Sequence, residues 1–191
     1  MPVDPPRARD LALLDAIDAF EREPFAQSVW RVVREGRDPL QGARSRSRWC
    51  NDTFTFDVLY ASLEREGALA EIYALLSSQP VFPSRIKSFV HCVSVRASKT
   101  LRLADMATLA KLGVDTARFR ERVYARTQEI ADAAYFLGFD GLIAPSARWD
   151  CHSLVLFTDR IQPSDIQLER TEPEPIDWQA WRRNHPGRSG R

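Results

Sequence analysis

The segment 68–76, Ala-Leu-Ala-Glu-Ile-Tyr-Ala-Leu-Leu, constrains the fold more than any other part of this chain. It is apolar nearly all round, and a helix with that pattern is buried on most of its sides. Glu71 is its single charge. A buried carboxylate must be paired or used chemically. Glu71 is therefore either the partner of a structural arginine or a catalytic group, and the residues around it leave both interpretations open.

The remaining periodicities predict a mixed protein built around that helix. Alternating or β-branched runs predict strands over 28–33, 54–60, 89–95, 141–144 and 153–157. Helical spacing predicts helices over 11–22 and over 115–137, the second ended by Gly138. The expected fold class is α/β (α+β), with small mixed sheets flanked by helices.

Length and composition favour one domain. A chain of 191 residues with 44% hydrophobic content can bury one sizeable core. We expect an N-terminal helical extension at 1–27, a catalytic domain at 28–162, and a polar C-terminal tail at 163–191 that Trp178 and Trp181 can dock onto the body.

Charge and cysteine usage exclude several classes of protein. The net charge of +1 provides no general field for nucleic acid or anionic lipid, so we expect neither nucleic-acid nor membrane binding. No apolar run is long enough to span a membrane and no signal-peptide pattern is present, which predicts a cytoplasmic protein. Three cysteines without Cys-x-x-Cys spacing and three dispersed histidines predict neither disulfides nor a metal site.

Arg31 places a charge inside a predicted strand, between Val29 and Val33 on one face. Such a guanidinium either faces water at a sheet edge or points into a cleft towards an anion. The sequence leaves these two placements equally open.

Three further positions could contact a ligand. Arg48 lies with Arg44 and Arg46 in a basic loop, which is either solvated or supplies forked phosphate donors, and solvation is favoured more for Arg44 and Arg46 than for Arg48. Tyr60 ends its strand, where its ring could form a cleft wall and its hydroxyl could meet a ribose or phosphate; a lone tyrosine is more often core. Ser146 follows a predicted strand end, but it lacks the Gly-x-Ser-x-Gly elbow of a serine hydrolase.

Six blocks, read in order, resemble the RES domain family of toxins. They are Val-Trp-Arg-Val at 29–32, Ser-Arg-Trp at 47–49, Leu-Tyr-Ala-Ser at 59–62, Ala-Leu-Ala-Glu at 68–71, Gly-Leu-Ile-Ala-Pro-Ser-Ala at 141–147 and Leu-Val-Leu-Phe at 154–157. The arginine, glutamate and serine that name the family match Arg31, Glu71 and Ser146.

The resemblance implies a fold similar to that of ADP-ribosyltransferase toxins, and an enzyme that acts on NAD. It implies the toxin half of a toxin–antitoxin pair, with a Xre-like antitoxin partner and self-association. Glu71 and Arg31 would be catalytic, while Arg48, Tyr60 and Ser146 would bind the substrate. NAD would be consumed by hydrolysis or phosphorolysis; the alternatives are mono-ADP-ribosylation of a protein and, more remotely, a non-catalytic nucleic-acid or protein-binding module.

Overall fold

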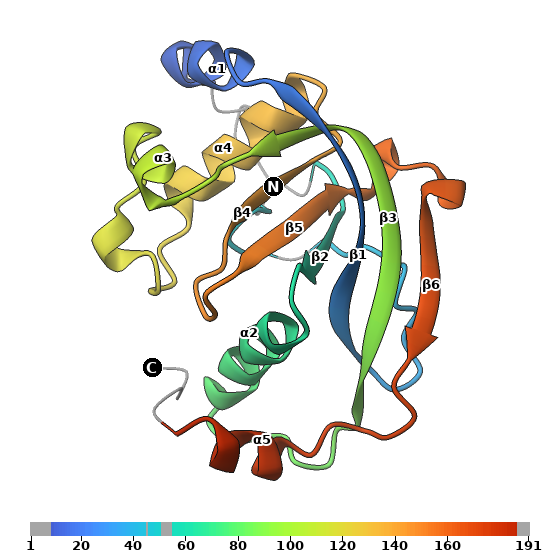
Figure 1. Cartoon of the computed structure of the whole chain (residues 1–191). Coiled ribbons are helices and arrows are strands. Elements are labelled where there is room, and N and C mark those ends of the chain that lie inside the picture. Colours follow the sequence, from blue (N-terminus) through green and yellow to red (C-terminus); the bar gives the residue numbers. More distant parts are fainter. Residues whose placement is uncertain (1–8, 45, 51–54, 187–191) are drawn as a thin grey trace, which may run out of the picture.

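The computed structural model describes residues 9–44, 46–50 and 55–186 (Figure 1). The strands are β1 (Arg22–Arg34), β2 (Val58–Ser62), β3 (Ser88–Arg102), β4 (Gly141–Pro145), β5 (His152–Phe157) and β6 (Ile166–Thr171). The α-helices are α1 (Leu11–Asp18), α2 (Arg65–Ser77), α3 (Met106–Lys111), α4 (Ala125–Phe136) and α5 (Trp178–Asn184). Three short 3₁₀ helices are η1 (Thr116–Arg118), η2 (Thr158–Arg160) and η3 (Pro163–Asp165).

Five of the strands close into a ring. The order along the sheet is β1-β2-β5-β4-β3-β6, and β1 also pairs with β3 along most of its length. The β3–β4 pairing is parallel, whereas the others are antiparallel. Alternate residues of the ring strands fill its interior, among them Val29, Val93 and Leu154. The sheet is therefore mixed, as expected.

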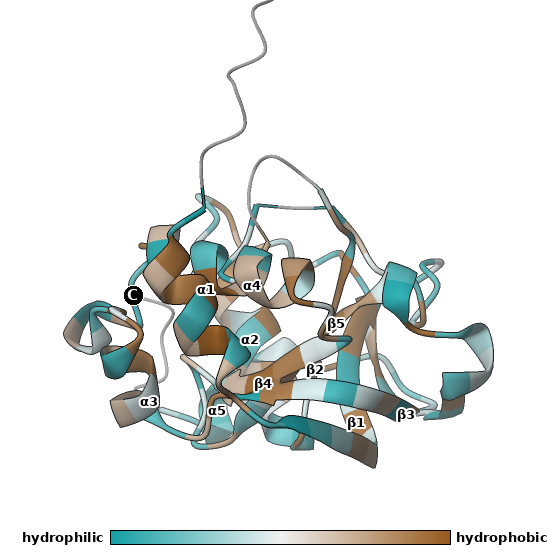
Figure 2. Cartoon of the chain, turned by 90° about the horizontal axis from the view of Figure 1, so that it is seen from above, coloured by the Kyte–Doolittle hydropathy of each residue, from teal (hydrophilic) through white to brown (hydrophobic). Residues whose placement is uncertain are grey.

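Helices cover the outside of the ring on two sides, as Figure 1 shows. On one side α1 and α4 pack over β4 and β5, with Ile17, Ile130 and Phe157 in a shared cluster. On the other side α2 and α5 pack over β1 and β3. There Val90 joins a cluster with Leu69 of α2 and the two tryptophans of α5. Figure 2 shows hydrophilic and hydrophobic residues alternating along β1 and β3, the pattern of strands that are covered unequally on their two faces.

Several boundaries differ from those predicted. The expected helix over 115–137 is divided, because η1 ends at Arg118 and α4 begins only at Ala125. Gly138 does end α4, with a left-handed φ of 83°. The helix α3, capped by the Asp105 side chain, was not predicted. The strand expected over 54–60 begins at Val58, and Phe54 lies outside the described residues.

The C-terminal region contributes to the body of the fold. Strand β6 pairs with β3, although the polar sequence there gave no sign of a strand. Trp178 and Trp181 of α5 are each only 7% exposed, and Trp181 lies 4.7 Å from the Tyr73 ring between centroids. Arg65 at the start of α2 also pairs with Glu172 through two bonds of 2.6 and 2.7 Å. The tail is thus held to α2 by both apolar and ionic contacts.

Within the described ranges, no helix is long and apolar enough to cross a membrane.

Candidate active site

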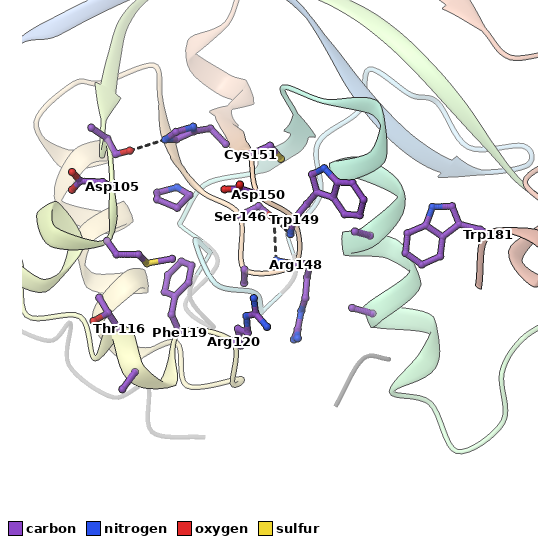
Figure 3. A pocket seen from close by; sticks show the side chains of 18 residues that line it. Asp105, Thr116, Phe119, Arg120, Ser146, Arg148, Trp149, Asp150, Cys151 and Trp181 are labelled. Atoms are coloured by element: carbon purple, nitrogen blue, oxygen red, sulfur yellow. Dashed lines mark hydrogen bonds between the residues drawn. The ribbon is translucent and has the colours of Figure 1, made fainter. Parts of the chain in front are cut away.

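A cavity of about 900 Å³ opens between the two helical sides of the ring (Figure 3). One wall comes from α2 and α5, through Ala70, Ala74 and Trp181. The opposite wall comes from α3, η1 and the residues that follow, including Phe119 and Arg120. Residues 145–152, which join β4 to β5, line the space between these walls. This volume falls within the range of ligand-binding pockets.

Ser146 brings Glu71 to this cavity. Its hydroxyl lines the cavity wall and donates a hydrogen bond to Glu71 Oε1 at 2.6 Å. Ser146 Oγ itself accepts from the backbone N–H groups of Arg148 and Trp149, at 3.1 and 3.2 Å. Within the described residues Glu71 makes no ion pair. The arrangement is therefore not the buried arginine pair that was one interpretation of Glu71.

Gly67 explains how α2 comes close enough for this contact. A Cβ at position 67 would collide with Ser62 Oγ and would lie 2.5 Å from Cys151 Sγ. Gly67 and Glu71 are four residues apart on α2, so they share one helix face. The absence of a side chain at 67 lets that face approach β2 and the β4–β5 connection. Sequence reasoning passed over this glycine, and its position directly before the predicted helical segment 68–76 was the available signal.

Arg48 lies at the tip of a tight turn. Ser47 and Cys50 exchange backbone hydrogen bonds of 3.0 and 3.4 Å, and Trp49, only 2% exposed, is buried in the core between them. The Arg48 guanidinium stacks over the Phe119 and Tyr124 rings, 4.3 and 4.9 Å from their centroids. Its Nη2 donates to Glu121 O at 3.4 Å, while the buried Nη1 has no partner within the described residues.

Arg48 interacts electrostatically with Glu71 and with Arg148. Burial lowers the pKa of Arg48, whereas the nearby Tyr124 and Glu71 oppose that shift and Arg148 adds to it. Arg48 is thus within electrostatic reach of Glu71 and of Arg148. A buried guanidinium with an unsatisfied donor is suited to an anion such as a phosphate.

Tyr60 has a different contact from the one predicted. Its hydroxyl forms a hydrogen bond of 2.7 Å with Ser47 Oγ and accepts one of 2.9 Å from Trp49 N. Burial raises its pKa well above the ordinary tyrosine value. The hydroxyl therefore holds the Arg48 turn. In α4, Gln128 supports the same turn by donating to Ser47 O and Cys50 O at 2.7 and 3.1 Å, a contact that the sequence did not reveal.

Arg31 does not join this group. It shares a strand face with Val29 towards the ring interior, whereas Trp30 and Val32 face α2 on the other side. Its guanidinium donates to the carbonyls of Pro39 and Gln41, the second at 3.3 Å. Burial lowers its pKa to about 10. The structure thus places Arg31 under the 39–41 loop and separates it from Glu71 by the sheet.

The other two arginines of the basic loop are exposed. Arg44 forms an exposed ion pair with Asp57 at 2.6 Å, and Arg46 is exposed, in agreement with the solvated interpretation.

Cys151 and His152 line the cavity, and His152 Nε2 contacts Ala104 O at 2.7 Å. The cavity residues missed by sequence reasoning include Phe119, Arg120, Arg148, Trp149 and Trp181. Within the described ranges, no cluster of three or more His, Cys, Asp or Glu side chains could hold a metal ion.

The fold and cavity define a class: a single-domain mixed α/β protein with a carboxylate held by a serine at a large open cavity. The chain belongs to the RES domain family, whose model matches residues 28–179. That match includes β6 and the start of α5, so it extends past the expected domain end at 162.

Comparison with individual proteins agrees with that membership. The chain is 22% identical to proteins named NAD(+) phosphorylase MbcT from Mycobacterium tuberculosis and Mycobacterium bovis, over 86% of this chain and 91% of the relative. A crystal structure of the M. tuberculosis MbcT–MbcA toxin–antitoxin complex matches with a TM-score of 0.79 and 21% identity. It covers 92% of this chain and 98% of the other. This likeness shows that this chain and the matched chain of the complex share a fold.

Proposed function

We propose that this protein is the toxin of a toxin–antitoxin pair and cleaves the bond between nicotinamide and ribose in NAD. The observation that carries the proposal is the Ser146–Glu71 hydrogen bond of 2.6 Å at the wall of the 900 Å³ cavity. It is supported by the names of the relatives, one an NAD(+) phosphorylase and the other part of a toxin–antitoxin complex.

Cleavage of the bond between nicotinamide and ribose needs few groups of the protein. The nicotinamide of NAD is cationic, so it leaves with the electron pair of the broken bond as a neutral molecule and needs no general acid. The ribose then gains oxocarbenium character, which a nearby carboxylate stabilises. We assign this role to Glu71. Water or phosphate forms the new bond to the ribose carbon and loses its proton to solvent, giving ADP-ribose or its phosphorylated form.

The remaining candidate residues would bind the substrate or position other groups of the site. Arg48 would hold a substrate phosphate through its unpartnered Nη1, and Ser146 would fix the Glu71 carboxylate while facing the ribose. Tyr60 would act through the turn that carries Arg48, since its hydroxyl is engaged there. Arg31 would act through the 39–41 loop, to which its guanidinium donates.

The direct test is to incubate the purified protein with NAD, with and without phosphate and with and without cell extract, and to identify the products by mass. Nicotinamide with ADP-ribose means hydrolysis, a phosphorylated ADP-ribose means phosphorolysis, and a protein mass increase means ADP-ribosyl transfer. Intact NAD together with salt-dependent DNA binding would replace the proposal by the non-catalytic alternative.

The toxin assignment has its own test in bacteria. Expression in the cytoplasm without an antitoxin should arrest growth and lower cellular NAD, while Glu71→Gln at equal soluble expression should do neither. A Xre-like antitoxin would silence the enzyme by covering the cavity or its opening. Normal growth with the unaltered protein, or a complex that leaves the cavity open to NAD, would count against these assignments.

A further inference from the structure

Two arginines that the family resemblance does not name line the same cavity from different elements. Arg120 follows η1 and is exposed, whereas Arg148 is half-buried in the connection between β4 and β5. Figure 3 shows both guanidinium groups extending towards the same end of the cavity. Of the acidic residues of the lining, Asp105 lies away from these two arginines in that view, beside α3, and Asp150 lies next to Ser146. Positive charge is therefore concentrated in one part of the cavity.

Arg148 is connected to Glu71 through Ser146 and interacts electrostatically with Arg48, although neither Glu71 nor Arg48 is among the residues that line the cavity. Arg148 N donates to Ser146 Oγ, the atom that donates in turn to Glu71, so the backbone of Arg148 is fixed relative to the carboxylate. Arg148 also lowers the pKa of Arg48 through like-charge repulsion. An anion beside Arg148 would offset this repulsion.

Arg120 is not committed to a structural contact. The neighbouring Arg118 forms an ion pair with Glu121 at 2.7 Å, and Arg122 donates to Ser78 Oγ. Arg120, in contrast, makes no hydrogen bond or ion pair in the parts of the chain that the structure describes. Its forked donors are therefore available to a molecule in the cavity.

We propose that Arg120 and Arg148 form a phosphate-binding pair in this cavity, an inference that rests on the proposed function. The ligand is a phosphate group. It comes either from the diphosphate of NAD or from free inorganic phosphate that acts as the acceptor. Two forked guanidinium groups from separate elements can donate to several of the non-bridging oxygens of such a group.

The test compares Arg120→Gln, Arg148→Gln and the double variant with Arg96→Gln. Arg96 is an exposed arginine on β3 whose replacement removes the same charge outside this cavity. Steady-state assays vary NAD at fixed phosphate and phosphate at fixed NAD. We expect each single cavity variant to raise one KM by about tenfold, the double variant to raise it further, and Arg96→Gln to leave both constants unchanged.

The two sources of phosphate give different results. If the pair binds free phosphate, the KM for phosphate rises and the KM for NAD does not. If it binds the diphosphate, the KM for NAD rises in hydrolysis and phosphorolysis alike. Unchanged constants in the double variant would overturn the inference while the proposed function stands. If the unaltered protein consumes no NAD, calorimetry with inorganic phosphate and with pyrophosphate still tests the pair. Binding that the double variant loses supports the pair, and equal binding overturns it.

Discussion

Ser146 Oγ donates a hydrogen bond to Glu71 Oε1 at 2.6 Å, although the two residues lie 75 positions apart in the sequence. The contact joins the buried helix α2 to the end of β4. It also ties the carboxylate to the backbone of the cavity lining, because the same hydroxyl accepts from two backbone amides. The residue with the only charge in segment 68–76 is thus held in one orientation by a residue of the cavity wall.

Glu71→Gln should lower the turnover of NAD by about a hundredfold or more and leave NAD binding nearly unchanged. Glutamine keeps the size of the side chain, and its amide oxygen can still accept from Ser146. It lacks the negative charge that stabilises the developing ribosyl cation. Single-turnover assays and calorimetry measure the two effects. A folded variant with normal turnover would return Glu71 to a structural role.

Ser146→Ala should reduce kcat by about ten- to a hundredfold through loss of carboxylate orientation. It should also reduce the free energy of unfolding by about 1–3 kcal/mol, since two backbone amides lose their acceptor. Ser146→Thr, which restores a hydroxyl, should recover part of kcat. Ser94→Ala, at a half-buried serine of β3, serves as the matched control. Equal kcat values for Ser146→Ala and the control would mean that the hydroxyl does not position Glu71.

Arg48→Ala and Arg31→Ala should differ in what they weaken. Loss of Arg48 removes a charged donor to a substrate phosphate, so the Kd for NAD should rise by an amount equivalent to about 1.5–3 kcal/mol. Arg31→Ala, at a residue that the family resemblance implies to be catalytic, removes the donor to the Pro39 and Gln41 carbonyls and should mainly lower stability. Calorimetry in the Glu71→Gln background and urea unfolding separate these effects. A larger loss of affinity for Arg31→Ala would reverse the two roles.

Tyr60→Phe should lower the free energy of unfolding by about 1–2 kcal/mol, because the ring still packs while Trp49 N loses its acceptor. The Arg48 turn should exchange its amide hydrogens faster, and the KM for NAD should rise more than kcat falls. Hydrogen exchange and kinetics check these expectations. Unaltered exchange at 47–50 would show that the Tyr60 hydroxyl does not support the turn.

The protein should be less stable in mild acid than at neutral pH because of the titration of His91. Burial first, and then the nearby Arg31 charge, lower the pKa of His91 below its ordinary value. Below about pH 6.5 the unfolded chain binds a proton that the folded protein does not. The free energy of unfolding should therefore decrease as pH falls through this range. The decrease should be smaller in His91→Gln, a variant that can still bond to Thr171. Parallel urea unfolding profiles between pH 7.5 and 5.5 for the two proteins would contradict this.

The sequence by itself determined the types of most strands and helices, though not those of α3 and β6, and it determined the candidate positions. Period-two alternation and the apolar segment 68–76 report burial directly, because each residue's own polarity decides which face it occupies. The Glu71 and Ser146 candidates followed from a lone buried charge and from an ordered set of family blocks. The break between η1 and α4 did not follow, because helical periodicity continues through 119–124, where Phe119 instead packs beneath the Arg48 guanidinium.

Only the tertiary structure decided which of these residues meet. Glu71 meets Ser146 because Gly67 lets α2 approach the β4–β5 connection, and no local pattern encodes that distance. Arg31 is separated from Glu71 because consecutive strand residues face opposite sides of a sheet, and the sequence does not state which side α2 covers. Arg120 and Arg148 come to one cavity from segments nearly thirty residues apart for the same reason: the packing of helices across a closed ring of strands fixes contacts that depend on all the elements at once.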